Sequence, residues 1–194
     1  MKKSGGKYQI CVSGAAKGET VAKGQESAKD LGRAIANAGH SLLSGATTGL
    51  PEYAAIAYKT AGGKMSLGIS PAATKVEHVL KYRLPTEPYD AILYTGLHYV
   101  GRDALLVNSA DAVVSIGGRL GTLHEFTIAL ETDTPIGFLD GTGGISSEIN
   151  RLLEILPNAD PKLIVFDDQA DSLITKITKL LDELHAPYKD IYSE

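Results

Sequence analysis

Four short segments rich in glycine and other small residues are the parts of this sequence best suited to bind an anion. They are residues 13–18 (SGAAKG), 44–49 (SGATTG), 117–122 (GGRLGT) and 141–144 (GTGG). Small residues let backbone N–H groups approach a phosphate closely, and a helix that follows such a loop directs its positive end toward it. Glycines also make simple turns, so the prediction of a phosphate-bearing ligand rests on the four loops together. None matches a strict GxGxxG or Walker pattern, which argues against a standard dinucleotide fold and a P-loop NTPase.

Each of these segments follows an apolar run that predicts a β-strand, and such runs alternate with segments of helical periodicity. The predicted strands are 8–13, 41–44, 65–69, 91–94, 112–116, 136–139 and 163–166. The predicted helices are 24–38, 51–61, 102–108, 122–131, 145–156 and 173–184. Residues 70–89 hold three prolines and show no clear period, so they predict a long loop with one helical turn.

This alternation of strands and helices predicts an α/β fold. We expect a Rossmann-like, doubly wound and mostly parallel sheet of about seven strands, with helices on both faces. The strands are apolar throughout, as burial on both sides of a sheet requires. Ligands of such sheets bind outside the C-terminal ends of the strands. The glycine-rich loops follow those ends, so we expect them to gather at one edge of the sheet.

Composition and charge exclude several classes of function. The chain has 194 residues and a mass of 20.5 kDa, which fits one domain over 1–194 with loosely held tails at 1–7 and 186–194. The formal net charge of −4 argues against a nucleic-acid partner, because general nucleic-acid binders need a cationic surface. The single cysteine, Cys11, excludes an intramolecular disulfide. The sequence shows no signal peptide and no apolar run that could span a bilayer, so we expect a cytoplasmic protein without a membrane partner.

The other side chains that could do chemistry form no metal or nucleophile pattern. The five histidines lack metal-ligand spacing, so no metal is predicted and most of them are expected at the surface or in loops. Cys11 lies in a predicted strand and is expected in the core. Four tyrosines between the third and fifth strands can stack on a base or pack the long loop: Tyr82, Tyr89, Tyr94 and Tyr99.

Residues 101–125, which read GRDALLVNSADAVVSIGGRLGTLHE, form the most specific segment of the chain. An arginine, Arg102, stands eight residues before an Ala-Asp pair, and an apolar strand then leads to a Gly-x-x-Gly-Thr-x-x-Glu element that ends at Glu125. This segment resembles the signature of the LOG-like family, phosphoribohydrolases that release cytokinin base from its riboside monophosphate. That family is related to the Smf/DprA and molybdenum-cofactor carrier groups. The resemblance extends over residues 10–156, including the loops at 13–18 and 44–49.

Several residues depart from the pattern of the best-studied members. This chain has Gly117-Gly118-Arg119 where they have Pro-Gly-Gly, and His124 where a second glutamate is frequent. Pro51 and Glu52 stand where Met-Gly is usual. The chain is therefore similar to a less studied branch, and the cytokinin substrate is not carried over.

The resemblance implies catalytic roles for Arg102 and Glu125. Cleavage of an N-glycosidic bond develops positive charge on the ribose, which a carboxylate can stabilise while a guanidinium orients it or binds phosphate. The resemblance implies an enzyme that releases free base and ribose 5-phosphate from an AMP-like nucleoside monophosphate, acting as a homodimer or larger assembly without a cofactor. The residues that would bind the nucleotide and its phosphate are Ser13, Gly14, Ala15, Gly45, Thr48, Gly49, Gly117, Gly118, Arg119, Leu120, Gly121 and Thr122.

Other interpretations remain open at this point. Thr122 and Glu125 also fit a capping box, in which the glutamate bonds the Thr122 N–H and so competes with a phosphate. Arg102 fits a surface ion pair with Asp103 or Asp111. The alternative function is a non-catalytic binding or carrier protein for a nucleotide or phosphorylated cofactor. A DNA-processing module is a third possibility, against which the acidic balance argues.

Overall fold

The computed structural model describes residues 7–156 and 160–187, and in them seven strands form one parallel sheet. The strands follow the order β4-β3-β2-β1-β5-β6-β7 across the sheet, and every neighbouring pair is parallel. Their bounds are β1 Gln9–Gly14, β2 Ser41–Ser44, β3 Ser66–Ser70, β4 Ala91–Tyr94, β5 Ala112–Ile116, β6 Ile136–Leu139 and β7 Ile164–Asp167. The predicted doubly wound α/β fold is confirmed, and all seven predicted strands are present.

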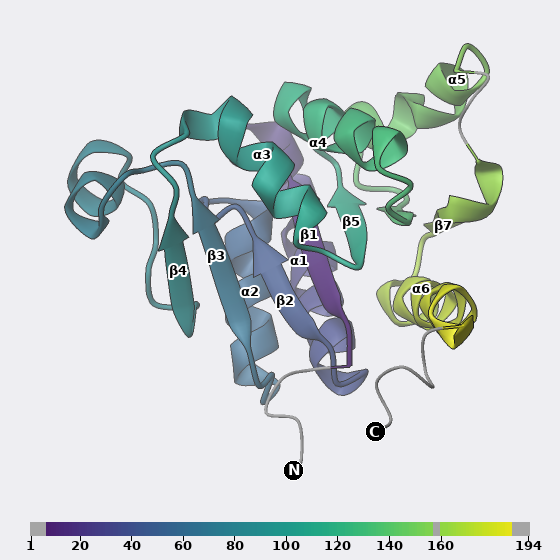
Figure 1. Cartoon of the computed structure of the whole chain (residues 1–194), viewed down its shortest axis with the longest axis horizontal. Helices are drawn as coiled ribbons and strands as arrows, with labels where there is room; N and C mark the ends of the chain where they lie inside the picture. Colours follow the sequence, from purple (N-terminus) through teal and green to yellow (C-terminus); the bar gives the residue numbers. More distant parts are fainter. Residues whose placement is uncertain (1–6, 157–159, 188–194) are drawn as a thin grey trace.

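Helices cover both faces of this sheet (Figure 1). One face carries α1 Glu19–Asn37, α2 Leu50–Thr60 and α6 Ala170–Leu184. The other carries α3 His98–Asn108, α4 Leu120–Glu131 and α5 Ile149–Leu153. Three shorter turns of other helix types complete the described chain: a π-helix at Glu77–Lys81 and 3-10 turns at Gly144–Glu148 and Pro161–Leu163. No helix within the described residues is long and apolar enough to cross a membrane.

The core lies in two layers, one on each side of the sheet. Ile10 and Val12 of β1 pack with α1, α2 and α6, whereas Cys11 between them packs with α3 and α4 on the opposite side. Successive side chains of a strand point to opposite faces, so both sets are apolar when both faces are buried. This explains the continuous apolar runs in the sequence, and it confirms Cys11 as a core residue.

Several helix boundaries differ from the prediction. α1 begins five residues earlier than expected, after Gly18, because its first five residues place one apolar side chain, Val21, against the core, which is too few to mark the spacing of a helix. α3 likewise begins at His98 rather than Arg102. The single helix expected at 145–156 is a 3-10 turn followed by the five-residue α5. Of the two expected tails, only Lys7, Ala186 and Pro187 lie within the described residues.

Two of the five histidines, His40 and His78, are buried, and the other three are at least partly exposed. His78 sits in the π-helix with its Nδ1 2.8 Å from the Ser70 hydroxyl and its Nε2 3.0 Å from the Pro85 carbonyl oxygen. His40, which directly precedes β2, has its Nε2 2.8 Å from the Thr178 hydroxyl. Burial lowers the pKa of His40, so it stays neutral at physiological pH. Both side chains have structural partners away from the glycine-rich loops.

The strand order reverses between β1 and β5. Strands β2, β3 and β4 extend from one side of β1, and β6 and β7 extend from the far side of β5. The loops that leave β1 and β5 therefore diverge and open a crevice at the carboxyl ends of these strands, where doubly wound sheets bind their ligands.

Candidate functional site

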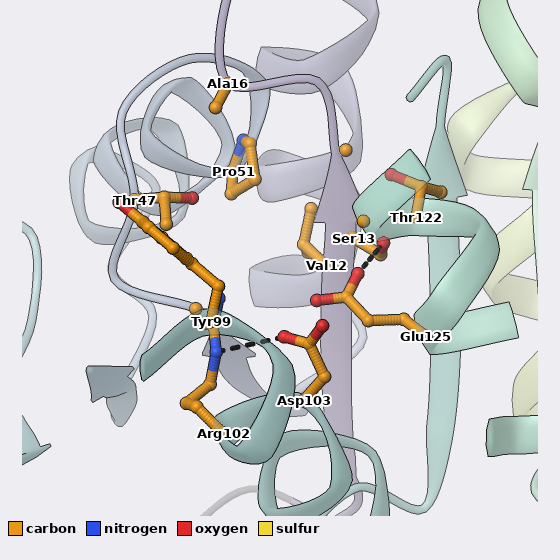
Figure 2. A pocket seen from close by; sticks show the side chains of 13 residues that line it. Val12, Ser13, Ala16, Thr47, Pro51, Tyr99, Arg102, Asp103, Thr122 and Glu125 are labelled. Atoms are coloured by element: carbon orange, nitrogen blue, oxygen red, sulfur yellow. Dashed lines mark hydrogen bonds and ion pairs between the residues drawn. The ribbon is translucent and has the colours of Figure 1, made fainter. Parts of the chain in front are cut away.

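A pocket of about 180 Å³ lies at this crevice. Its walls come from the end of β1, the loop after β2, the start of α2 and the facing sides of α3 and α4 (Figure 2). The lining residues are Val12, Ser13, Gly14, Ala16, Gly45, Thr47, Pro51, Tyr99, Arg102, Asp103, Gly121, Thr122 and Glu125. Segments more than 100 residues apart in the sequence thus contribute to one site.

Arg102 is a buried cation in the wall of this pocket. It projects from α3, its exposed fraction is 3%, and its Nη1 donates a hydrogen bond of 3.0 Å to the Ile69 carbonyl oxygen at the end of β3. Its Nε forms an ion pair of 3.1 Å with Asp103 Oδ1, which Figure 2 draws as a dashed line. The predicted partnership with Asp103 is therefore confirmed, but its predicted surface location is wrong, because both side chains are buried.

Asp103 is the acidic residue that connects α3 to α4. Its second carboxylate oxygen, Oδ2, lies 2.8 Å from His124 Nδ1. A carboxylate held between a guanidinium and an imidazole has both oxygens occupied, which fixes its orientation. Asp103 therefore positions Arg102 and His124 relative to each other across the interface of the two helices.

Glu125 is the second acid of the pocket, and its environment favours the protonated form. The side chain is buried on α4 and accepts a hydrogen bond from the Ser13 hydroxyl at the end of β1 (Figure 2). Its pKa is raised to about 7, mainly by burial and then by the negative charge of Asp103, while Arg102 acts in the opposite direction. A carboxyl group with this pKa can hold or release a proton near neutral pH.

The capping-box interpretation of Thr122 and Glu125 is wrong. α4 begins at Leu120, so Thr122 is already inside the first helical turn and Arg119 occupies the N-cap position without a side-chain cap. The Glu125 carboxyl bonds the Ser13 hydroxyl instead. The sequence spacing fits a capping box only if the helix starts at Thr122, which is where the apolar periodicity had placed it.

Half of the predicted site residues line the pocket, and the other half lie around it. The residues that line it are Ser13, Gly14, Gly45, Arg102, Gly121, Thr122 and Glu125. The predicted residues outside its lining are Ala15, Thr48, Gly49, Gly117, Gly118, Arg119 and Leu120. The pocket is thus centred on the end of β1 and on the α3–α4 interface rather than on the full length of the 117–122 loop.

Backbone groups of the 117–122 loop hold the neighbouring 141–146 segment. The Gly117 N–H donates to the Thr142 hydroxyl at 2.8 Å, and the Gly117 carbonyl accepts from the Ser146 hydroxyl at 2.8 Å. The Gly118 carbonyl accepts from the Ile145 N–H at 3.0 Å. The 141–146 segment is therefore hydrogen-bonded to the 117–122 loop. The Gly117 N–H is used in this contact.

Arg119 joins two loops at the rim. Its exposed guanidinium donates from Nη2 to the Lys17 carbonyl oxygen at 3.0 Å, so it extends from the start of α4 to the loop after β1. Two other predicted residues shape loops in a similar way, because the Ala15 carbonyl accepts from the Leu50 N–H and the Thr48 hydroxyl donates to the Ala16 carbonyl.

Sequence reasoning did not assign six of the lining residues to the site. Val12, Ala16 and Thr47 lie beside or within predicted loops, and Pro51 opens α2. Asp103 was visible only as an ion-pair partner, and Tyr99 only as one of four clustered tyrosines. Whether these two side chains face the pocket depends on how α3 is rotated against α4, which no local pattern reports. Within the described residues, no group of three or more potential metal ligands lies together.

The family model for the SLOG cluster4 family matches residues 7–173 of this sequence. The chain belongs to the SLOG cluster4 family. Among curated proteins, this SLOG cluster4 protein is 33% identical over 123 residues to an uncharacterized protein of Archaeoglobus fulgidus, covering 63% of this chain and 74% of that protein. The family agrees with the resemblance noted in the sequence, without fixing an activity.

Two solved structures similar to this SLOG cluster4 protein are molybdenum-cofactor proteins. The molybdenum cofactor carrier protein of Chlamydomonas reinhardtii is 26% identical with a TM-score of 0.75, covering 90% of this chain and 98% of that one. The molybdenum cofactor binding protein of the phototrophic bacterium Rippkaea orientalis is 26% identical with a TM-score of 0.67, covering 92% and 97%. Both likenesses extend over nearly the whole of each chain.

Proposed function

We propose that this protein binds a nucleotide or another phosphorylated cofactor in the pocket and acts as a binding or carrier protein. The observation that carries the proposal is the start of α4. No described side chain caps this helix, and Gly121 and Thr122 of its first turn line the pocket. The first N–H groups of a helix lack internal partners and carry partial positive charge, which suits them to bind a phosphate.

A buried cation supports the same proposal. The guanidinium of Arg102 lines the pocket together with the start of α4, so both place positive charge at one small volume. Pro51 at the start of α2 also lines the pocket, but it has no N–H to offer, and the Leu50 N–H already donates to the Ala15 carbonyl. The relatives whose names describe molybdenum-cofactor carriage or binding favour the carrier role over hydrolysis.

Hydrolysis of an N-glycosidic bond is the second candidate, and one observation favours it. Glu125, with its pKa raised to about 7, lines the same pocket as Arg102. In this reaction Glu125 would accept a proton from water, the water oxygen would bond to the ribose carbon, and the base would leave with the electron pair of the broken bond. The Ser13 hydroxyl, which bonds Glu125, would orient the carboxylate.

We further infer that two copies of the chain associate through α3. Its outward face exposes Leu97, Val100 and Leu105, with small residues Gly101 and Ala104 between them. An apolar helix face of this kind with small central residues suits close antiparallel packing against a second copy of itself. The other face of α3 carries Arg102 and Asp103, so this association would support the pocket from behind.

Calorimetry with AMP, combined with detection of free adenine and ribose 5-phosphate, separates the two functions. Binding without release of adenine is the result expected of a carrier. Turnover that is lost in Glu125→Ala but kept in Glu26→Ala, an exposed glutamate on α1, would establish hydrolysis instead. If AMP, a phosphorylated pterin and inorganic phosphate all fail to bind to the protein, the whole proposal is overturned. Salt-sensitive binding to single-stranded DNA would favour the DNA-processing alternative.

A further inference from the structure

Tyr99 presents an aromatic ring at the side of the pocket. It is the second residue of α3 and lines the pocket, yet 46% of the residue remains exposed. Figure 2 shows it on the opposite side of the cavity from Thr122, whose helix start is the proposed phosphate site. A ligand that reaches from Thr122 across the cavity would therefore meet the Tyr99 ring.

The ring is supported by neighbouring residues before any ligand binds. Tyr82 contacts it edge to face, with the ring centroids 5.6 Å apart and the planes at 78°. The Tyr82 hydroxyl in turn lies 2.8 Å from Nδ1 of His98, the residue that precedes Tyr99. Such an arrangement restricts the rotation of Tyr99, so less conformational entropy is lost when the ring contacts a ligand.

The size of the pocket indicates that part of the ligand must lie at the rim. Its volume of about 180 Å³ is below the roughly 300–1,000 Å³ of sites that enclose a drug-sized ligand. It can enclose a phosphate and the group next to it. The remainder of a nucleotide-sized ligand would extend past the enclosed volume, where the half-exposed Tyr99 stands.

We propose that Tyr99 stacks on the planar heteroaromatic ring of the bound ligand and thereby selects ring-bearing phosphates over phosphorylated sugars. This inference rests on the proposed function, because it needs a phosphate-bearing ligand in the pocket. Purines and pterins share the required flat π-face, and stacking of this kind tolerates either ring. Tyr82 acts as a positioning residue, because its edge-to-face contact keeps the Tyr99 ring in one orientation.

The test is calorimetric measurement of Kd for AMP and for ribose 5-phosphate, which lacks the base. We expect Tyr99→Ala to weaken AMP binding about tenfold, the range seen when a stacking aromatic residue is removed, and to leave ribose 5-phosphate unchanged. Tyr99→Phe keeps the flat ring and should retain AMP affinity. Val76→Ala, at an exposed position outside the pocket, serves as a matched control that should change neither Kd. Thermal unfolding of each variant checks that it is folded.

A second pair of probes separates the two sources of a planar ring. Neopterin triphosphate is compared with inorganic triphosphate, as AMP is with ribose 5-phosphate. Loss of affinity in Tyr99→Ala for only one ring-bearing probe supports the inference and identifies the ring. If Tyr99→Ala binds both members of each pair as the unchanged protein does, or weakens both equally, the stacking role is overturned while the proposed function stands. If none of the four probes binds the unchanged protein, the proposed function is overturned as well.

Discussion

The guanidinium of Arg102 lies directly against the backbone of Gly45. A Cβ atom at residue 45 would stand 1.8 Å from Arg102 Nη1 and 2.6 Å from Cζ. The loop pattern predicts that Gly45 binds phosphate through its backbone, and the structure adds a steric role for this glycine that no spacing rule contains. The glycine is required because a side chain from α3, 57 positions along the chain, occupies the space next to it.

This contact predicts that Gly45→Ala and Arg102→Ala are strongly coupled. Alone, Gly45→Ala must push the guanidinium off Ile69 and Asp103, and we expect a loss of about 1–3 kcal/mol in the free energy of unfolding. In an Arg102→Ala background the added methyl meets no guanidinium, so the same change should cost less than about 0.5 kcal/mol. Urea unfolding of the four proteins of this cycle measures the coupling. Additive effects would show that the Gly45–Arg102 contact is not what requires glycine.

The raised pKa of Glu125 predicts a pH-dependent gain of stability in Glu125→Gln. The folded protein holds the Glu125 proton between the ordinary pKa of 4.5 and about 7, whereas the unfolded chain releases it. Stability contributed by the neutral carboxyl is therefore complete below 4.5 and is lost as pH rises through about 7. Near pH 8 the buried charge costs roughly 3 kcal/mol, and glutamine, which carries no charge, avoids this cost.

The measurement is urea unfolding of both proteins near pH 5 and near pH 8. Glu125→Gln should be the more stable protein near pH 8 and should differ by less than about 1 kcal/mol near pH 5. Glu26→Gln, at an exposed position paired with Lys29, is the matched control and should show no such pH dependence. A Glu125→Gln protein that is less stable than its parent near pH 8 would contradict the raised pKa.

The parts of the fold predicted from the sequence are those that local pattern determines. Residues 112–116 are apolar at every position because both faces of β5 are buried, and the glycines after the strand mark its end. The first turn of α1 is not predicted, because Val21 alone among its residues packs against the core and one apolar contact shows no periodicity. The helix predicted at 145–156 is interrupted because Ser146 turns inward to bond the Gly117 carbonyl.

The site was predictable as far as the family motif extends. Arg102 and Glu125, which the motif marks, do line one pocket. Asp103 and Tyr99 share it only because α3 packs against α4 at a particular rotation, which is a property of the tertiary structure. The burial that raises the pKa of Glu125 likewise depends on residues from β1 and α3 together.

Anion binding in the pocket should become stronger as pH falls from about 8 to about 6. When Glu125 is ionised, it and Asp103 both repel an anion, while Arg102 and the start of α4 attract it. Protonation of Glu125 removes one of these two negative charges from the pocket wall, so the repulsion of an anion falls. Sulfate is the suitable probe because its own charge is constant over this range.

Calorimetry with sulfate in two buffers of different ionisation enthalpy measures both affinity and proton uptake. We expect affinity at least about fivefold higher at the lower pH, with net uptake of protons near pH 7. In Glu125→Gln the pH dependence should shrink, because the carboxyl group with the raised pKa is gone. An affinity that rises with pH would overturn the electrostatic account of the pocket.

The exposed apolar face of α3 predicts that the chain forms a dimer. A single substitution that introduces a charge on this face should dissociate it. Val100 is 71% exposed at the centre of this face, between Leu97 and Ala104, so an isologous contact would bring it close to its own copy. Val100→Glu would then bury two like charges near each other and should yield a monomer in sedimentation velocity. Its thermal unfolding should remain cooperative, because Val100 is outside both core layers. Val79→Glu, at an exposed apolar position of the π-helix, is the control that should leave the dimer intact. A parent protein that sediments as a monomer at high micromolar concentration would rule out this use of α3.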